Sequence, residues 1–282
     1  MELNNGIIKI SIADHGAELK SVIKNGREYM WCGDAKYWGR TSPVLFPFVG
    51  SVNGKKYTLN GKDYPMGQHG FARDCDFKQI GHTENSAEYI LESNDETLSK
   101  YPFKFSLNIK YIINGAVLRM EWLVSNRDNK PMSFSIGAHP AFNLMQGQNY
   151  FKFNTDNDII YSLVNENGLL IEDKVYSLKT TERYAAITEN MFDLDALIVE
   201  NNQASSVSLC GPDKKPYVTV NFTAPLFGLW SPAGKNAPFV CIEPWYGRAD
   251  KIGFSGDLFE REYASELKPD ESFAASYEIE FI

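Results

Sequence analysis

The sequence contains few cysteines, and their spacing disfavours the commonest roles of that residue. The 282 residues include four, Cys32, Cys75, Cys210 and Cys241. No two of them form the Cys-x-x-Cys pair of many metal sites, and their density is far below that of a disulfide-stapled domain. None stands beside a histidine in the sequence, so the local pattern does not favour a nucleophilic thiol. We expect reduced thiols in or near the core.

Long apolar runs and clusters of positive charge are missing as well. No stretch is long enough to cross a bilayer, and the N-terminal segment lacks the basic flank and apolar run of a signal peptide. The formal net charge of -8, with no Lys/Arg-rich stretch to offset it, disfavours nucleic acid and anionic lipid as partners. We therefore expect a cytoplasmic protein without a membrane partner. The sequence gives no indication of its oligomeric state.

Helical patterns are nearly absent, and only Asp95–Lys100 is consistent with a short helical turn. Alternating apolar and polar residues instead recur along the whole chain, which predicts half-buried strands. The clearest runs are residues 7–14, 105–113, 117–124, 217–223 and 277–282, with a further strand at 132–136. There is neither a polar linker nor a fixed-period repeat, and 43% of the residues are hydrophobic. The sequence predicts one all-β domain over residues 1–282, a large antiparallel β-sandwich.

Four Asn-Gly pairs mark candidate turns between these strands. They begin at Asn25, Asn53, Asn60 and Asn114. This dipeptide readily takes the positive φ angles of tight hairpin turns. The pair at Asn114 has an alternating run on both sides and is the clearest hairpin.

The four histidines can each be considered individually. His15 and His82 stand among polar, turn-like residues and are predicted to be solvated. His69 has glycines on both sides, which let a backbone approach a ligand closely, and Arg73 follows four residues later. His139 follows the end of a predicted strand, a common position for catalytic groups. A buried histidine satisfied by hydrogen bonds is the alternative interpretation of His139.

Glu243 lies in a strongly apolar, strand-like run, Phe239–Trp245. A glutamate is rarely buried without a partner, so this position is costly unless the side chain is paired or used. The alternation of a strand leaves open that Glu243 points outward to solvent instead. The following Pro244 and Trp245 argue against an exposed strand, because proline ends a strand ladder and tryptophan offers a flat face for a sugar. Glu243 is therefore the best candidate for a general base.

Two aspartates precede a short apolar strand at residues 196–199. Asp193 and Asp195 have the same parity and would share one face of an extended segment. Either could hold a hydroxyl group of a ligand. For Asp193, a position at the lip of a loop is an equally good interpretation.

A carboxylate and an imidazole suit the opening of a sugar hemiacetal ring. One group takes the proton of the anomeric hydroxyl while another gives a proton to the ring oxygen. An imidazole with the ordinary pKa of ~6.5 can act as the acid near neutral pH, and burial raises the pKa of a carboxyl group toward useful basicity. This chemistry needs neither a metal ion nor another cofactor.

The order of these segments resembles that in aldose 1-epimerases. The chain has His69 beside Gly70, the segment His-Pro-Ala-Phe-Asn-Leu from His139, an aspartate before Ala-Leu-Ile-Val, and Ile-Glu-Pro-Trp around Glu243. The whole chain is similar to the galactose mutarotase-like superfamily, whose fold is a large antiparallel β-sandwich. The resemblance implies an isomerase that interconverts the anomers of an aldose.

The resemblance also implies roles for individual residues. His139 would be the general acid toward the ring oxygen, Glu243 the general base at the anomeric hydroxyl, and His69 a group that positions and polarises the substrate. Asp195 matches the hydroxyl-binding aspartate of the family, because the apolar strand follows it directly. Arg40, just ahead of the segment Pro-Val-Leu-Phe-Pro, is similar to a substrate-contacting arginine.

The sequence around His69 differs from that of galactose mutarotases. Those enzymes typically have Leu-His-Gly-Gly, whereas this chain has Gln-His-Gly-Phe-Ala-Arg, which is more similar to the hexose-6-phosphate branch and its bacterial relatives. Arg40 and Arg73 could bind a sugar phosphate through bidentate hydrogen bonds, or serve in structural ion pairs. The expected ligand is therefore a free or phosphorylated aldose.

Two other functions stay open. One is a non-catalytic sugar-binding or regulatory module, since fold alone does not fix function. The other is a glycosidase or lyase domain that pairs Glu243 with an aspartate.

Overall fold

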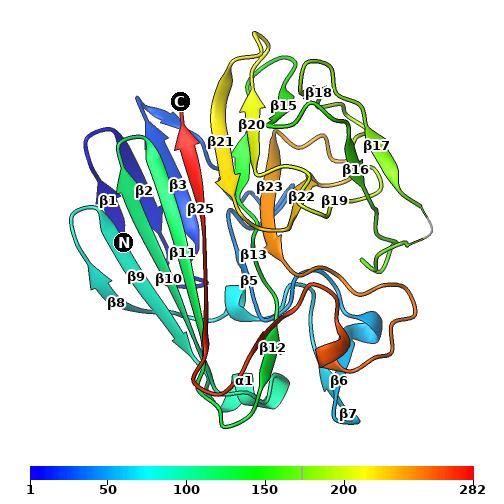
Figure 1. The fold of residues 1–282 in the computed structure, drawn as a ribbon. Helices are drawn as coiled ribbons and strands as arrows, with labels where there is room; N and C mark the ends of the chain where they lie inside the picture. The colour runs from blue at the N-terminus through cyan, green and yellow to red at the C-terminus, as the bar shows by residue number, and fades with distance from the viewer. Residues whose placement is uncertain (173) are drawn as a thin grey trace.

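The chain folds into two large sheets that face each other, as Figure 1 shows. This computed structural model describes residues 1–172 and 174–282. Within those residues, every pairing between named strands is antiparallel. The predicted all-β antiparallel sandwich is confirmed.

The two large sheets contain most of the strands. The nine-stranded sheet has the order β18 (Tyr184–Ala186), β15 (Tyr150–Phe153), β20 (Ser206–Cys210), β21 (Pro216–Phe222), β25 (Ser272–Phe281), β11 (Val117–Asn126), β10 (Phe105–Asn114), β9 (Ser86–Glu92) and β8 (Lys78–His82). The six-stranded sheet has the order β19 (Leu197–Val199), β22 (Leu226–Trp230), β23 (Phe239–Tyr246), β13 (Ile136–Ala138) and β5 (Val44–Leu45), and β14 (Ala141–Asn143) also pairs with β23.

Smaller sheets surround these two. A four-stranded sheet contains β1 (Glu2–Asn4), β2 (Ile8–Ile12), β3 (Leu19–Lys24) and β4 (Arg27–Glu28). The two-stranded sheets pair β6 (Lys56–Leu59) with β7 (Lys62–Pro65), β12 (Met132–Phe134) with β24 (Ser265–Leu267), and β16 (Ile159–Tyr161) with β17 (Tyr176–Leu178).

Helical structure in the described residues is short. The helix α1 (Asp95–Lys100) forms where the sequence predicted one turn, and Asn94 caps it by accepting a hydrogen bond from the backbone N–H of Thr97. Three 3-10 turns cover Asn53–Lys55, Ala72–Asp74 and Leu258–Glu260. None of these helices is long and apolar enough to cross a membrane.

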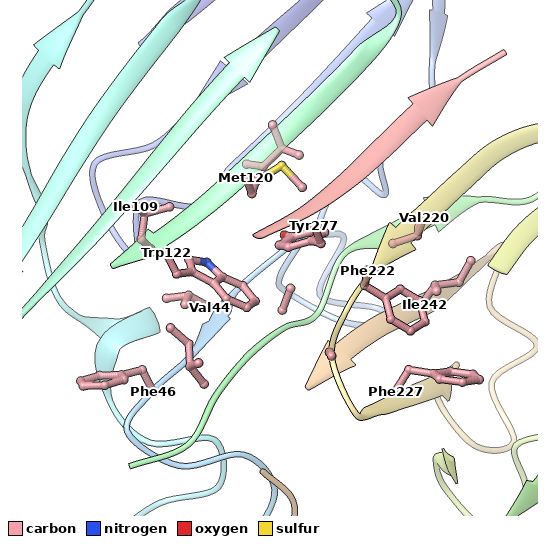
Figure 2. Packing of buried hydrophobic residues seen from close by; sticks show 14 of the residues in the cluster. Val44, Phe46, Ile109, Met120, Trp122, Val220, Phe222, Phe227, Ile242 and Tyr277 are labelled. Carbon is pink, nitrogen blue, oxygen red and sulfur yellow. The ribbon is translucent and has the colours of Figure 1, made fainter. Parts of the chain in front are cut away.

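The main core lies between the two large sheets (Figure 2). Ile109, Met120 and Trp122 approach it from β10 and β11 of the nine-stranded sheet. Phe227 of β22 and Ile242 of β23 approach it from the six-stranded sheet. Successive side chains of a strand point to opposite faces, so the six-stranded sheet has a second face that this core does not use.

Most predicted strands are present, with two differences. β2, β10, β11 and β21 lie close to the predicted ranges, whereas β25 already begins at Ser272, within a stretch of small residues that shows little alternation. The strand predicted at residues 132–136 is wrong as a single element. It is divided into β12 and β13, which pair with β24 and β23 in different sheets, and Ser135 lies between them.

The Asn-Gly pairs behave differently from one another. Those at Asn25 and Asn60 form two-residue hairpin turns in which both residues have positive φ. The pair at Asn53 lies in the 3-10 turn Asn53–Lys55, so a hairpin prediction is wrong there.

The hairpin predicted between residues 113 and 117 is confirmed, but the turn is shifted by one residue. Asn114 pairs with Val117 in the ladder, so Gly115 and Ala116 are the central residues. Gly115 has φ 58, whereas Ala116 is not among the residues with positive φ. A single positive φ at the first central position is typical of a type II′ turn.

The cysteines are free in the structure, and three of them match the prediction. Cys210 and Cys241 are buried and Cys75 is partly buried. The prediction is wrong for Cys32, which is exposed because it follows the buried Trp31 at the start of an irregular segment.

Two histidines lie at the surface, as predicted. His15 is exposed and forms a 2.7 Å contact with Asp76. His82 is exposed at the end of β8.

Candidate active site

Glu243 lies on β23, on the face of the six-stranded sheet that points away from the main core. Val240 and Ile242 belong to the main core, whereas Cys241 and Trp245 belong to separate clusters on the same side as Glu243. Glu243 is only 1% exposed, so the alternative of a solvated, outward glutamate is wrong. One strand thus supports the core on one face and a buried carboxyl group on the other.

Pro244 does not end this strand, contrary to the prediction. β23 continues to Tyr246, and Pro244 pairs with Phe227 of β22. On the other side, β14 pairs with residues 239–241 and β13 with residues 245–246. The missing N–H of proline therefore falls where the ladder on that side is interrupted.

His139 lies in this interruption, between β13 and β14. β13 pairs Gly137 with Trp245, and β14 continues the same register beyond the break. Two residues after Gly137, that register places His139 opposite Glu243. The side chains of directly opposite residues lie about 5 Å apart on one face of a sheet. Strand pairing therefore brings the two groups together although they are distant in the sequence.

The side chains of His139 and Glu243 are in contact. Nε2 of His139 lies 3.3 Å from Oε2 of Glu243, and the two side chains are 8% and 1% exposed. In the described part of the chain, neither carboxyl oxygen of Glu243 nor Nδ1 of His139 has a hydrogen-bond partner. Buried polar atoms without a partner are rare and costly. Their presence together marks this pair as a candidate catalytic centre.

Burial changes the protonation of both groups. Removal from water raises the pKa of Glu243 well above its ordinary value, and the nearby charge of Asp195 adds to the rise. Removal from water, together with the positive charge of Arg73, lowers the pKa of His139 to about 3. The prediction of an ordinary imidazole pKa is therefore wrong. Both shifts favour the uncharged form of each group, which places the proton of the pair on Glu243 and leaves His139 neutral.

Two tryptophans fix the plane of the His139 ring. Trp38 stacks on the imidazole with ring centroids 4.7 Å apart and an interplanar angle of 27°. Trp230 of β22 meets it edge to face, at 5.2 Å and 82°. A stacked contact and an edge contact together restrict rotation of the ring. Neither tryptophan could be predicted as a site residue, because nothing in its local sequence connects it with His139.

His69 reaches the site from the loop after β7. Its backbone has φ 65, an uncommon value outside glycine. The N–H of Gly50 donates to Nδ1 of His69 at 3.1 Å, and burial lowers the pKa of His69 well below 6.5. The ring is thus neutral with its proton on Nε2, which can donate to a ligand oxygen.

The glycine after His69 has a different role from the predicted one. A Cβ on Gly70 would lie 2.2 Å from the carbonyl oxygen of Phe46. Gly70 therefore allows two backbone segments to approach each other, rather than a backbone to approach a ligand.

Of the two predicted arginines, Arg73 lines the site and Arg40 does not. The Arg73 guanidinium donates to the carbonyl of Gln68 at 2.7 Å, and its buried Nε has no hydrogen-bond partner but lies 3.8 Å from Oδ2 of Asp74. Burial lowers the pKa of Arg73 to about 10, so it stays charged near neutral pH. Arg40 instead forms a 2.7 Å ion pair with Asp74 and donates a 3.5 Å hydrogen bond to the backbone carbonyl of Arg73. This contact is the structural alternative considered for Arg40, and substrate contact by Arg40 stays a prediction.

Asp195 lines the site, whereas Asp193 is exposed at its margin. Residues 189–194 form turns and Asp195 has φ 75, so the expectation of one extended segment with a shared face is wrong. Oδ1 of Asp195 accepts a hydrogen bond from the N–H of Ala196 at 2.8 Å, which holds the carboxylate at the start of β19.

Trp245 packs between two glycines of the neighbouring strands. A Cβ on Gly228 or Gly137 would lie 2.5 or 2.6 Å from its indole ring. The residue lines the site but is only 4% exposed, so little of the ring surface is open to a ligand. The stacking role predicted for Trp245 stays a prediction.

These side chains line one cavity of about 200 Å³. It brings together six predicted site residues, His69, Arg73, His139, Asp195, Glu243 and Trp245. It adds Trp38, Trp230 and Gln68, which sequence analysis did not identify. A buried acid-base pair, a neutral histidine donor, a cation and a carboxylate thus converge on one concave space.

One group at this cavity has the donor atoms of a metal site. The ligand atoms of His139, Cys241 and Glu243 lie within 4.8 Å of one another in the described structure. Thiolate, imidazole and carboxylate are typical zinc ligands. Burial raises the pKa of the Cys241 thiol well above its ordinary value, which disfavours the thiolate and makes the sulfur a poor nucleophile.

Comparisons with known proteins identify related sequences and similar structures. Residues 1–280 match the family model described as aldose 1-epimerase. The chromosomal LacX protein of Lactococcus lactis subsp. lactis is 30% identical to this chain. The alignment is 295 residues long and covers 99% of this chain and 98% of that protein.

Two solved structures are similar along their whole length. A galactose mutarotase related enzyme from Lactobacillus acidophilus is 35% identical with a TM-score of 0.93, covering 100% of this chain and 97% of that one. A galactose mutarotase-like protein from Lactobacillus casei is 28% identical with a TM-score of 0.94, covering 100% and 99%. The chain therefore belongs to the aldose 1-epimerase family.

Proposed function

We propose that this protein is an aldose 1-epimerase that interconverts the α and β anomers of an aldose or aldose phosphate. The observation that carries the proposal is the contact between His139 and Glu243, with both carboxyl oxygens buried and without a hydrogen-bond partner. Family membership supports the same reaction class. The proposed site of action is the cytoplasm.

The pair can move the two protons that the reaction needs. When substrate binds, the shared proton passes from Glu243 to His139 across their 3.3 Å contact. Glu243 then takes the proton of the anomeric hydroxyl, the bond between C1 and the ring oxygen breaks, and His139 gives its proton to that oxygen. Rotation about C1–C2 exposes the other face of the aldehyde. Ring closure reverses both transfers, so the pair ends with the single proton it held at the start.

The other cavity residues bind and orient the sugar in this proposal. The Nε2–H of His69 donates to a substrate oxygen, and the carboxylate of Asp195 accepts from a hydroxyl group. Arg73 supplies the positive charge that would face a phosphate. Side chains provide both proton transfers, so the proposal includes no cofactor.

A panel of free aldoses and their 6-phosphates tests the reaction. The protein is expected to accelerate anomer exchange, measured by polarimetry or NMR exchange spectroscopy, for at least one member. Sugar binding that saturates without any acceleration would contradict the proposal and favour a non-catalytic module.

Replacing Arg73 distinguishes a phosphorylated from a free substrate. If the substrate carries a phosphate, Arg73→Ala removes a charge-assisted hydrogen bond, and we expect kcat/KM for the 6-phosphate to fall roughly 10- to 100-fold more than for the free aldose. Arg119→Ala, on the exposed part of β11, is the matched control. An equal loss for both substrates would restrict Arg73 to binding hydroxyl groups.

The pH dependence tests the shared proton. Lowering the pKa of His139 to about 3 and raising that of Glu243 both widen the pH range over which the pair holds a single proton. After subtraction of the spontaneous rate, we expect kcat/KM to fall as the pH rises through the raised pKa of Glu243, and to stay level on the acid side down to about pH 3. A loss of activity as the pH decreases through about 6.5 would show that the pair takes up a second proton there, which contradicts the lowered pKa of His139.

A further inference from the structure

A buried donor atom beside the catalytic pair has no hydrogen-bond partner in the described residues. It is Nε1 of Trp245, two residues after Glu243 on β23. An indole N–H can only donate, and a buried one usually finds an acceptor. Because Nε1 itself is buried, a sugar in the cavity cannot reach it. The acceptor therefore has to come from the protein.

The carboxyl group of Glu243 is an acceptor of the right kind in the right place. Residues two apart on a strand point to the same face, and both Glu243 and Trp245 line the cavity. Both carboxyl oxygens of Glu243 are buried and likewise lack a partner in the part of the chain that the structure describes. An unsatisfied donor and an unsatisfied acceptor are thus neighbours on one strand, where each would be costly alone.

Two glycines allow the indole ring to lie across β23 toward Glu243. Gly137 of β13 pairs with Trp245, and Gly228 of β22 pairs with Glu243. A Cβ on Gly137 would lie 2.6 Å from Cδ1 of the ring, and a Cβ on Gly228 would lie 3.3 Å from Cε2 and 2.5 Å from Cζ2. Nε1 is bonded to Cδ1 and Cε2. The edge of the ring that carries the N–H therefore runs from the residue beside Trp245 to the residue beside Glu243.

The surroundings of Glu243 otherwise disfavour its ionised form. Burial raises the pKa of the carboxyl group and the negative charge of Asp195 adds to the rise, whereas the Trp245 side chain acts in the opposite direction as a hydrogen-bond donor. The titratable and charged groups around Glu243 belong to the cavity and to its own strand: His69, Arg73, His139, Asp195 and Cys241. An indole N–H differs from these groups because it can stabilise a carboxylate without ever changing its own protonation.

We propose that Trp245 is a positioning residue for the general base, and that its indole N–H donates to the Glu243 carboxylate when the shared proton moves to His139. This hydrogen bond stabilises the negative charge at the step in which Glu243 takes the anomeric proton, and it directs the carboxylate toward the cavity. The inference rests on the proposed function for its effect on rate. It adds to that function a residue that supports the base without touching the sugar through this N–H.

Removing the N–H alone tests this role. Replacing Trp245 with 3-benzothienylalanine puts sulfur in place of the N–H and keeps the shape of the ring, whereas Trp245→Phe removes the N–H together with part of the ring. We expect both variants to lower kcat/KM for anomer exchange about 10- to 100-fold, the effect of one hydrogen bond to a charged group. A loss confined to Trp245→Phe would come from packing and would overturn the proposal.

The ionisation of Glu243 gives a second readout, which a purely structural role would not move. The infrared band of the protonated carboxyl group, identified by its absence in Glu243→Gln, disappears as the pH rises through the pKa. Without the N–H the carboxylate is less stable, so the pKa rises further. In the benzothienyl variant the band should persist to about one pH unit or more above wild type. Disappearance at the same pH in both proteins overturns the proposal.

Trp122→Phe is the matched control. Trp122 is a buried tryptophan on β11 that belongs to the main core and does not line the cavity. This variant should leave the pH dependence of the Glu243 band unchanged. Because the infrared titration needs no substrate, it decides the role of Trp245 even if no sugar of the panel is turned over, a result that would contradict the proposed function alone.

Discussion

Glu243→Gln is expected to reduce kcat/KM for anomer exchange by about 10²- to 10⁴-fold, the contribution typical of a general base. The amide has nearly the same shape as the carboxyl group, but it can neither hold the shared proton nor pass it to His139. Polarimetry or NMR exchange spectroscopy with the best aldose of the panel measures the loss.

The same substitution should stabilise the protein at neutral and alkaline pH. Because folding raises the pKa of Glu243, the folded state resists losing a proton that the unfolded state gives up readily. In the unfolded state the pKa of Glu243 is about 4.5, and below this pH its contribution to the free energy of unfolding is fully present. This contribution is lost as the pH rises from there through the pKa of Glu243 in the folded state. Glutamine has no such loss, so the free energy of unfolding of the variant should exceed that of wild type increasingly from pH 4.5 upward.

Glu280→Gln is the matched control for both measurements. Glu280 is exposed on β25 and lies outside the cavity. We expect its activity and stability to stay close to wild type. A Glu243→Gln variant that folds and retains wild-type exchange rates would show that this carboxyl group is not the base.

His139→Asn is expected to lower kcat/KM by a similar factor, about 10²- to 10⁴-fold, because the ring oxygen loses its proton donor. His82→Asn, at an exposed position on β8, should retain wild-type rates. Full activity in a folded His139→Asn variant would require another acid, for which His69 is the nearest candidate in the cavity.

The stability of His139→Asn should differ from wild type in the acid range. Folding lowers the pKa of His139 to about 3, so the unfolded state binds an extra proton between about pH 6.5 and pH 3. Wild-type stability therefore falls as the pH decreases through this window. Asparagine does not titrate, and the variant should lose less stability between neutral pH and pH 4, measured by urea unfolding at each pH.

Local patterns predicted the strands well where strands of the nine-stranded sheet bury alternate residues. In β10, the side chains of Leu107, Ile109, Tyr111 and Ile113 are buried and those of Asn108, Lys110 and Ile112 less so. Such alternation can be read from a few neighbouring residues. Where a strand is buried on both faces, as in β23, the pattern disappears, and the sequence left two orientations for Glu243.

The pairing of β13, β14 and β23 could not be predicted in the same way. It depends on contacts between segments about one hundred residues apart, and local sequence does not encode their register. The family resemblance identified His139 and Glu243 as partners, and the apolar run around Glu243 indicated a raised carboxyl pKa, but their direct contact and the lowered pKa of His139 follow from burial that only the fold creates. Trp38 and Trp230 were missed for the same reason.

The two-sided use of β23 has a consequence for how the protein can lose activity. Ile242 anchors the strand in the main core, and the adjacent Glu243 faces the cavity. A shift of the backbone that displaced the carboxyl group would also withdraw a neighbour from the tightly packed interior. Heat inactivation should therefore coincide with cooperative melting of the whole sandwich, because displacing the Glu243 carboxyl group disturbs the core that holds β23.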